Sequence, residues 1–189
     1  TYHIAPAEKF AVVPLGLDLE PYSSAPRHVG TFRAEWNIPP DAPLVGIVGR
    51  LVPIKNHALF LEAARRVREQ VPGAHFAIVG DGELRAVLEA QASAPGLAGA
   101  VTFTGFLRDL RPVYSDLDLL AISSDNEGTP VSIIEALAAG VPVVSTAVGG
   151  VPDLLQGGRY GTLVPPGDAE ALAEAMIASL SAPRTDRQE

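Results

Sequence analysis

The 189-residue sequence predicts a single doubly wound α/β domain, in which helices cover both faces of a mostly parallel sheet. Short apolar runs alternate with segments of helical periodicity nearly from end to end. These runs are mostly apolar at successive positions, which is typical of strands buried on both faces. Polar, glycine-containing loops follow several runs, at the carboxyl edge where sheets of this class bind ligands.

The expected strands, in chain order, are 11–14, 44–48, 75–79, 101–104, 119–122, 141–145 and 162–164. The expected helices are 56–70, 83–92, 109–115, 131–139 and 168–180. In the first helix, Leu61, Ala64 and Val67 recur at helical spacing. The stretch 21–30 reads as an ordinary surface connection. We expect one domain over 1–181, followed by a polar tail at 182–189.

Composition excludes several classes of protein. With 47% hydrophobic and 19% charged residues, the chain is expected to be globular. A net charge of -8 and a pI near 5.0 speak against a nucleic-acid partner. The chain has no cysteine, which leaves no thiolate metal site and favours a reducing, cytoplasmic setting. The four histidines lack metal-ligand spacing, so no metal site is predicted.

The segment 125–140 is the most informative about function, because a polar loop there runs into a short apolar helix. Pro130 falls near the first helical position and Gly140 just past the last. Glu127 lies in the loop and Glu135 in the helix, so both carboxylates can face one cavity at the helix mouth. Free N–H groups and the helix dipole favour an anion there. The segment therefore suits a phosphate-bearing ligand with hydroxyl groups, such as a sugar nucleotide.

Each glutamate also has a simpler explanation. Glu127 could cap the helix, and an isolated Glu135 could face solvent. The neighbours of Glu135 are apolar, however, and a buried carboxylate requires hydrogen-bond donors, which a ribose diol supplies.

A loop with two cations, 49–56, follows the second expected strand. Arg50 offers a bidentate fork and Lys55 a compact point charge, so together they could straddle a diphosphate. Taken alone, two solvated loop cations explain the pattern at least as well. A site holding two glutamates and a diphosphate would, however, need cations to offset their repulsion.

Three further loops carry weaker signals. Gly80 and Gly82 let the backbone approach a ligand closely, although a tight turn before a helix explains them equally well. Arg85 occupies the third glycine position of a dinucleotide fingerprint, which disfavours an NAD site. The backbone of residues 104–107, including Phe106 and Leu107, could contact a nucleobase edge, although a turn with a core Phe explains this stretch better on sequence alone. The stretch 148–153 either closes the site or is a glycine-rich connection.

Together these segments resemble the C-terminal, donor-binding half of a retaining glycosyltransferase of family four, which has the two-domain GT-B fold. The resemblance covers nearly the whole chain. It rests on the order and spacing of Val12-Val13-Pro14-Leu15-Gly16-Leu17-Asp18, Gly49-Arg50-Leu51 with Lys55, Gly80-Asp81-Gly82, Phe103-Thr104-Gly105-Phe106, and two glutamates separated by seven residues.

The resemblance implies a role for each candidate residue. Arg50 and Lys55 would bind the donor diphosphate, with Gly49 beside them, and Glu127 would hold hydroxyls of the donor sugar. Glu135 would accept from the ribose, and Leu107 with its neighbour Phe106 would lie by the base. The backbone at Gly128, Thr129, Pro130 and Val131 would contact sugar or phosphate, with Gly80 and Gly82 also near the ligand.

The resemblance also implies what the whole protein does. The donor would be a UDP- or GDP-sugar, and transfer would retain the anomeric configuration without metal or another cofactor. The acceptor-binding N-terminal half is expected to be absent from this chain and to make any membrane contact. The protein would then be cytoplasmic or peripheral to the inner membrane face, and this part alone inactive. A non-catalytic nucleotide-sugar-binding module and a sugar-nucleotide epimerase of the same fold stay open as alternatives.

Overall fold

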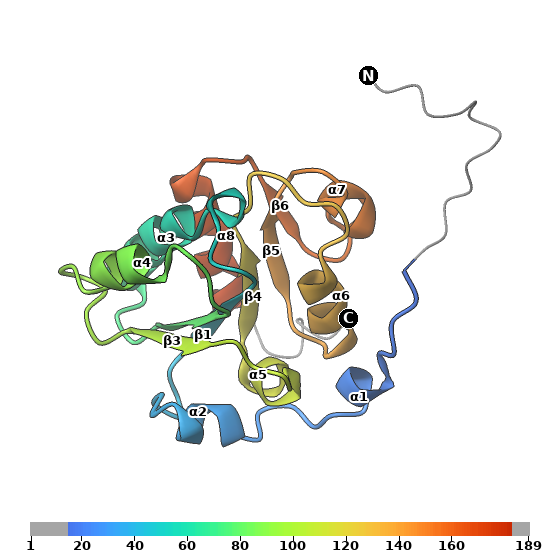
Figure 1. The fold of residues 1–189 in the computed structure, drawn as a ribbon, viewed down its shortest axis with the longest axis horizontal. Helices are drawn as coiled ribbons and strands as arrows, with labels where there is room; N and C mark the ends of the chain where they lie inside the picture. Colours follow the sequence, from blue (N-terminus) through green and yellow to red (C-terminus); the bar gives the residue numbers. More distant parts are fainter. Residues whose placement is uncertain (1–14, 183–189) are drawn as a thin grey trace.

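A computed structural model describes residues 15–182 and contains one six-stranded, wholly parallel sheet with the order β3-β2-β1-β4-β5-β6 (Figure 1). The strands are β1 (Leu44–Val48), β2 (His75–Val79), β3 (Val101–Gly105), β4 (Leu119–Ile122), β5 (Val143–Thr146) and β6 (Thr162–Val164). The predicted doubly wound α/β class is confirmed. The expected strand 11–14 lies outside the described residues.

The chain reverses direction across the sheet between β1 and β4. It adds β2 and β3 on one side of β1, then crosses to β4 on the other side. Such a switch point opens a crevice at the carboxyl ends of the strands, because the loops that follow the two central strands lead to opposite faces of the sheet. Since β1 and β4 are neighbours, the loops after them both begin at this crevice.

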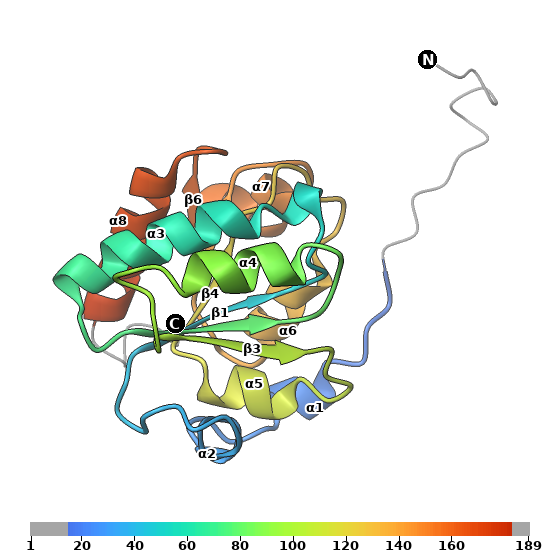
Figure 2. The ribbon, with the colours of Figure 1, turned by 60° about the vertical axis from the view of Figure 1, so that its left-hand side comes forward.

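Helices cover both faces of the sheet (Figure 2). The helices are α1 (Glu20–Ser23), α2 (Thr31–Glu35), α3 (His57–Gln70), α4 (Arg85–Ala92), α5 (Arg111–Asp116), α6 (Val131–Ala138), α7 (Val151–Leu154) and α8 (Ala169–Ser181). Two short 3-10 helices are η2 (Pro53–Lys55) and η3 (Gln156–Gly158). None of the helices in residues 15–182 is both long and apolar enough to cross a membrane.

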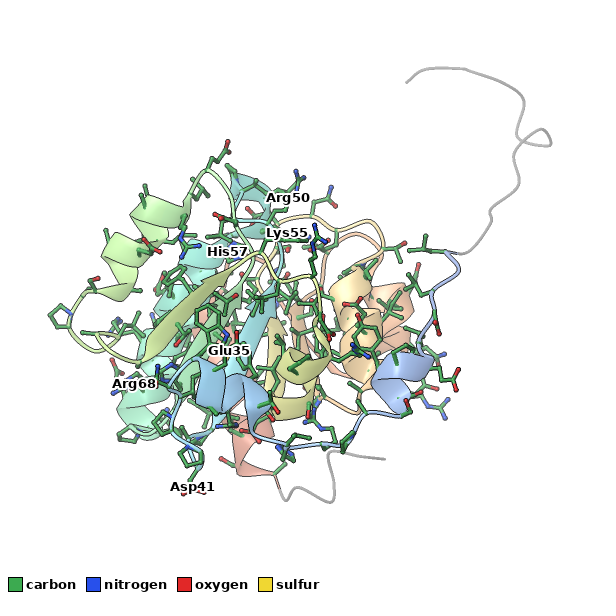
Figure 3. All side chains as sticks on the ribbon, turned by 60° about the horizontal axis from the view of Figure 1, so that its bottom comes forward. Glu35, Asp41, Arg50, Lys55, His57 and Arg68 are labelled. Atoms are coloured by element: carbon green, nitrogen blue, oxygen red, sulfur yellow. The ribbon has the colours of Figure 1, made fainter. Side chains whose placement is uncertain are left out.

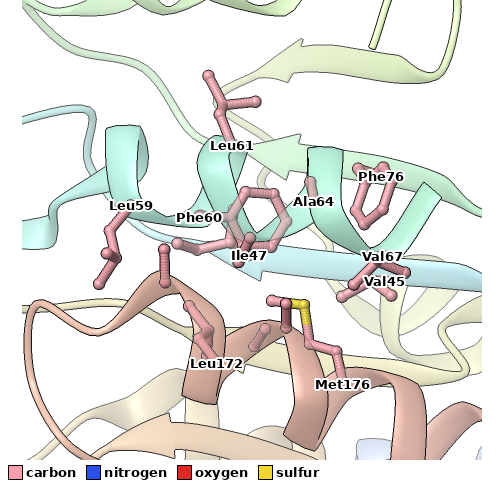
Figure 4. Close-up of a cluster of buried hydrophobic side chains, with 14 of the residues drawn as sticks. Val45, Ile47, Leu59, Phe60, Leu61, Ala64, Val67, Phe76, Leu172 and Met176 are labelled. Atoms are coloured by element: carbon pink, nitrogen blue, oxygen red, sulfur yellow. The ribbon is translucent and has the colours of Figure 1, made fainter. Parts of the chain in front are cut away.

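Two hydrophobic cores result, one on each face. In the first, α3 and α8 pack over β1 and β2 (Figure 4). The rings of Phe60 and Phe76 meet edge to face there, with centroids 6.0 Å apart. The second core lies under α2, α5 and α6 and contains Tyr114 and Ile133. Burial on both faces explains why the strands are apolar at successive positions.

The element boundaries follow local chemistry. Asn56 caps α3 by accepting from the Leu59 N–H at 3.2 Å, and Asp168 caps α8 through the Ala171 N–H at 2.9 Å. Both residues were included in the predicted helices, which therefore start one residue too early. Pro130 is the residue before α6, and Gly140 follows α6 with φ +68°, a conformation that glycine adopts without strain.

The prediction that 21–30 is an ordinary surface connection is wrong. Residues 20–23 form α1, and a buried polar network anchors the chain around α2. The Asp116 carboxylate accepts from the N–H groups of Gly30 and Arg33 at 2.7 and 3.1 Å. The Arg33 guanidinium donates to Asp118 at 2.9 Å and to the Asp116 carbonyl at 3.0 Å. A buried pair separated by more than eighty residues leaves no local sequence pattern.

Candidate functional site

The loops after β1, β2 and β3 surround a cavity of about 320 Å³ at the carboxyl edge of the sheet. It is lined by Val48, Gly49, Arg50, Val79, Gly80, Asp81, Phe106, Leu107 and Leu110. Most of these side chains are apolar, and Phe106 is 75% exposed. The predicted site residues Gly49, Arg50, Gly80, Phe106 and Leu107 therefore meet around one cavity.

Lys55 links this cavity to the loop after β4. Its ammonium lies 2.6 Å from a carboxylate oxygen of Glu127, and the hydroxyl of Ser124 donates to the same oxygen at 2.6 Å. A Cβ at Gly49 would lie 3.9 Å from Cδ and Cε of Lys55, so the lysine stem passes beside the cavity loop. Figure 3 shows Arg50 and Lys55 at the same edge of the molecule.

Further hydrogen bonds hold the β1 and β4 loops together. The Asn56 amide donates to Asp125 at 2.9 Å, and the Asp125 N–H donates to the Ile54 carbonyl at 2.9 Å. The buried Ser123 hydroxyl donates to the carbonyls of Lys55 and Asn56. The Lys55–Glu127 pair thus lies between two loops that are fixed to each other, which lowers the entropy lost when the pair forms.

Glu127 does not cap α6. The residue at the cap position is Pro130, and no side chain caps the helix. The Glu127 carboxylate instead accepts hydrogen bonds from Lys55 and Ser124. Gly128 and Thr129 are exposed just before the helix. The N-terminus of α6, which begins at Val131, therefore offers an anion-binding position beside the Lys55–Glu127 pair.

Two glycines near the site allow the loops after β1 and β2 to pack closely against each other. A Cβ at Gly80 would lie 1.9 Å from the Gly49 carbonyl oxygen, and one at Gly82 would lie 2.5 Å from the Leu51 carbonyl oxygen. Both glycines were expected to let a ligand approach the backbone. The structure instead gives each a packing role against the β1 loop, and of the two only Gly80 also lines the cavity.

The stretch 148–150, which follows β5, packs against the loop that carries Glu127. A Cβ at Gly149 would lie 1.7 Å from the Glu127 carbonyl oxygen, and the Gly150 N–H donates to that oxygen at 3.1 Å. Both alternatives left open for 148–153, a closing loop and a plain connection, therefore miss its structural role. Its glycines allow the backbone to pack under Glu127.

Glu135 belongs to a separate cluster. Its two carboxylate oxygens accept from the hydroxyls of Tyr22 and Tyr114, each at 2.9 Å. Neither Glu135 nor Glu127 lines the cavity described above, and the expectation that both glutamates face one cavity stays a prediction. Tyr114 connects the cluster to the wall of that cavity through the backbone, because its N–H donates to the carbonyl of the lining residue Leu110 at 3.0 Å.

Two groups near the site have shifted pKa values. Burial, together with the hydrogen bond and charge of Glu135, raises the pKa of Tyr22 to about 12. Burial and the neighbouring Lys55 charge lower the pKa of His57 to about 4. Within residues 15–182, no three His, Cys, Asp or Glu side chains gather closely enough to hold a metal ion. Metal independence stays a prediction.

A cavity at the carboxyl edge of a doubly wound sheet, next to a cation–carboxylate pair that joins the β1 and β4 loops at the switch point, is typical of a Rossmann-like ligand-binding domain. The chain belongs to the family described as glycosyl transferases group 1, whose family model matches residues 42–182. The resemblance to family-four glycosyltransferases and to one half of a GT-B fold is thereby confirmed.

Curated relatives are themselves named as glycosyltransferases. A lipopolysaccharide core biosynthesis glycosyltransferase of Rhizobium meliloti is 36% identical over 155 residues, which are 82% of this chain and 44% of that protein. A GDP-mannose-dependent phosphatidylinositol monomannoside mannosyltransferase of Mycolicibacterium smegmatis is 31% identical over 95% of this chain and 49% of its own length. The chain spans about half the length of the curated relatives it matches.

Solved structures share the fold. HepE of Anabaena, crystallised with UDP and glucose, aligns with a TM-score of 0.86 and 27% identity over 98% of this chain and 50% of its own. The C-terminal domain of a group 1 glycosyl transferase of Francisella tularensis aligns over 92% of both chains, with a TM-score of 0.74 and 23% identity. The same fold therefore occurs as a single domain in another structure.

Sequence reasoning missed three residues of the site region. Tyr22 lies in a stretch that was interpreted as a plain connection, and Tyr114 was included only as part of the expected helix 109–115. Ser124, which is 1% exposed, lies in the strand-to-loop transition after β4. A possible signal for Ser124 was its position three residues before Glu127, within reach of that carboxylate. Tyr22 offered none, because its partner is 113 residues away.

Proposed function

We propose that this chain is the donor-binding half of a glycosyltransferase that transfers a sugar from a UDP- or GDP-linked donor to an acceptor. One observation carries the proposal: an apolar cavity, a fixed lysine–glutamate pair and an uncapped helix N-terminus lie side by side at one sheet edge. Its relatives are named as glycosyltransferases, and HepE was crystallised with UDP-glucose as well as with UDP.

The cavity suits a nucleobase. Its walls are apolar, and backbone groups at Phe106 and Leu107 lie at its rim, where they can hydrogen-bond the edge of a base. The exposed Phe106 ring offers a flat apolar surface. Uracil and guanine both satisfy these features. The choice of a UDP- or GDP-linked donor is supported by a relative named as GDP-mannose-dependent and by HepE, which was crystallised with UDP.

The diphosphate would lie between the cavity and α6. There it meets the exposed Arg50 at the cavity rim, the Lys55 ammonium and the N-terminus of α6. The Lys55 ammonium is held by Glu127 in the absence of ligand and would then be shared with the phosphate. Fixed cations of this kind stabilise the charge that develops on a leaving diphosphate.

The donor sugar would lie beyond the phosphates, with its hydroxyls on Glu127 and on the backbone at Gly128 and Thr129. In the reaction, the bond between sugar C1 and the β-phosphate oxygen breaks and the nucleoside diphosphate leaves with the electron pair. A bond forms from C1 to the acceptor oxygen, whose proton is released. We propose that transfer retains the anomeric configuration and needs no metal.

In this proposal, the acceptor substrate is bound by another part of the protein. Because the chain spans about half of its relatives' length, we propose that an N-terminal half binds the acceptor and makes any membrane contact. Relatives named for lipopolysaccharide and colanic acid biosynthesis support a role in cell-surface polysaccharide or glycolipid synthesis. We propose that this synthesis takes place in the cytoplasm or at the inner face of the membrane.

Isothermal titration calorimetry tests the proposal. We expect the chain to bind UDP or GDP in the micromolar to millimolar range, and the matching nucleoside monophosphate more weakly, because Arg50, Lys55 and α6 face two phosphates. Failure to bind either diphosphate at millimolar concentration would contradict the proposal. AMP serves as the control for non-specific anion binding.

An assay of the full-length protein separates the enzyme from its alternatives. Transfer of labelled sugar from the donor to an acceptor supports a glycosyltransferase. Conversion of the donor into an epimeric sugar nucleotide would indicate an epimerase. Binding without either reaction would indicate a regulatory module.

A further inference from the structure

The carboxylate of Glu135 is held by two tyrosines from different parts of the chain. Tyr22 of α1 donates to one oxygen and Tyr114 of α5 to the other, each at 2.9 Å. The two rings also pack against each other edge to face, with centroids 5.7 Å apart. Each hydroxyl is therefore aimed by ring packing as well as by its hydrogen bond.

These contacts leave a defined pair of acceptor positions on Glu135. A carboxylate has about four lone-pair positions, two on each oxygen. The tyrosines take one on each oxygen, so each oxygen keeps a position for one more donor. Two hydroxyls on adjacent carbons match such a pair, whereas a single hydroxyl uses only one of the two positions.

Both tyrosines remain hydrogen-bond donors throughout the neutral pH range. Burial and Glu135 raise the pKa of Tyr22 to about 12, and the same causes raise the pKa of the fully buried Tyr114 further. An ionised phenol beside a carboxylate is disfavoured by charge repulsion. The orientation of Glu135 is thus fixed before any ligand arrives.

The family resemblance assigns the ribose to Glu135, and we propose that Tyr22 and Tyr114 are the residues that position its carboxylate for this contact, so that their loss reduces the preference for ribonucleoside over deoxyribonucleoside diphosphates. The inference rests on the proposed function, because it places the ribose next to the base cavity. Leu110, one turn before Tyr114 on α5, lines that cavity. A prearranged acceptor pair discriminates strongly against a ligand that leaves it unpaired.

Tyr22 contributes to the cluster from outside the sheet. It lies in α1, before residue 42, where the match to the family model begins. The α1 helix has no buried residues of its own and packs against α5 and α6. The orientation of Glu135 therefore depends on a short segment that precedes the first strand of the sheet.

The test is a ligand-by-variant comparison using calorimetry. Whichever of UDP and GDP binds is measured beside its 2′,3′-dideoxy analogue, with the wild-type chain and with Tyr22→Phe and Tyr114→Phe. We expect the wild type to prefer the ribonucleotide by on the order of tenfold or more. Each variant keeps the ring and should reduce this preference about three- to tenfold, with little change in affinity for the dideoxy analogue.

Tyr160→Phe is the matched control. Tyr160 is 43% exposed, and its ring contacts Arg159, so loss of its hydroxyl should leave both affinities unchanged. If burial makes Tyr114→Phe unstable, the partly exposed Tyr22→Phe alone decides the outcome. Circular dichroism confirms that each variant is folded.

Three results would overturn the inference. Equal losses for the ribonucleotide and its dideoxy analogue would show that the tyrosines only stabilise the fold. An unchanged preference in the folded Tyr22→Phe variant would show that Tyr22 does not position Glu135, while the proposed function would stand. Binding of neither diphosphate to the wild type would overturn both.

Discussion

At the scale of single residues, the position of Lys55 is fixed at both ends of its side chain. Its ammonium is paired with Glu127 at 2.6 Å, and its stem runs beside Gly49 of the cavity loop. It is 27% exposed, so a ligand phosphate can reach it without breaking the pair. The pair keeps the ammonium in place, which lowers the entropy cost of binding an anion there.

We therefore expect Lys55→Ala to weaken binding of the diphosphate more than binding of the nucleoside. A charge-assisted hydrogen bond is worth about 1.5–3 kcal/mol, which corresponds to a loss of about tenfold to a hundredfold for UDP or GDP. Titration calorimetry of both ligands measures this. Arg65→Ala, at an exposed cation on α3, should change neither affinity. Equal losses for nucleoside and diphosphate would contradict the assignment of Lys55.

Gly149 can be tested by substitution, with Gly157 as a closely matched control. Gly149 and Gly157 both have positive φ, at +52° and +65°, but a Cβ meets the Glu127 carbonyl oxygen only at Gly149. Gly157→Ala should lower the free energy of unfolding by about 1–2 kcal/mol through backbone strain alone. Gly149→Ala should lower it by about 2–4 kcal/mol and also weaken diphosphate binding, because the Glu127 loop must move.

Urea unfolding and calorimetry of the two glycine variants check this prediction. If both variants lose the same stability and keep full diphosphate affinity, the packing of the 148–150 stretch does not support the loop that carries Glu127.

At the scale of elements, buried polar contacts join α2 to the sheet. Arg33 and Asp118 form an ion pair at 2.9 Å with both side chains almost fully buried, and Asp118 also accepts from the Leu44 N–H at 2.9 Å. The same guanidinium donates to the Ala42 carbonyl at 2.7 Å. Every donor and acceptor named here has a partner, which is the condition under which a buried pair is tolerated.

Arg33→Met should lower the free energy of unfolding by about 3–5 kcal/mol, because it leaves the Asp118 carboxylate buried without its cation. The exposed Arg65–Glu69 pair on α3 is the control, and Arg65→Met should cost less than about 1 kcal/mol. Urea unfolding monitored by circular dichroism compares the two. A similar small loss in both variants would mean that Arg33 contributes no more than a surface cation.

The sequence predicted the elements whose evidence is local. Runs such as 44–48, 75–79 and 119–122 match the strands to the residue, because burial on both faces makes nearly every position apolar. The helices α1, α2 and α7 were missed, since four or five residues are too few to show a 3.6-residue period. The strand expected at 141–145 begins at Val143, because apolar residues continue beyond the paired backbone.

In the candidate site too, contacts that follow from the order of strands and loops were predicted, and contacts between distant side chains were not. Gly49, Arg50, Phe106 and Leu107 were predicted together because topology alone gathers loops at the carboxyl edge of a parallel sheet. The different partners of the two glutamates were not predicted. Lys55 and Ser124 hold Glu127, whereas the hydroxyls of Tyr22 and Tyr114, from distant segments, hold Glu135.

At the scale of the whole molecule, His57 makes stability depend on pH. It is 1% exposed, neither ring nitrogen has a hydrogen-bond partner, and burial together with Lys55 lowers its pKa from 6.5 to about 4. Between these values the unfolded chain binds more protons than the folded one. Stability is therefore fully present above about pH 6.5 and is lost as pH falls toward 4.

We expect this loss to reach about 3 kcal/mol from His57, and His75, whose pKa is also lowered by burial, adds to it in the same direction. Urea unfolding at several pH values between 7.5 and 4.5 measures the slope. His57→Leu, which has no titrating group, should flatten it. A slope that His57→Leu leaves unchanged would place the pH dependence on other groups.

The anchoring of α1 and α2 has a practical consequence for anyone who prepares this protein. A recombinant fragment trimmed to begin at residue 42, where the match to the family model starts, would lack the arginine and the phenol that the preceding segment supplies. The aspartate at position 118 would lose that cation and the aspartate at position 116 two backbone N–H donors, and such a shortened product should express poorly or precipitate.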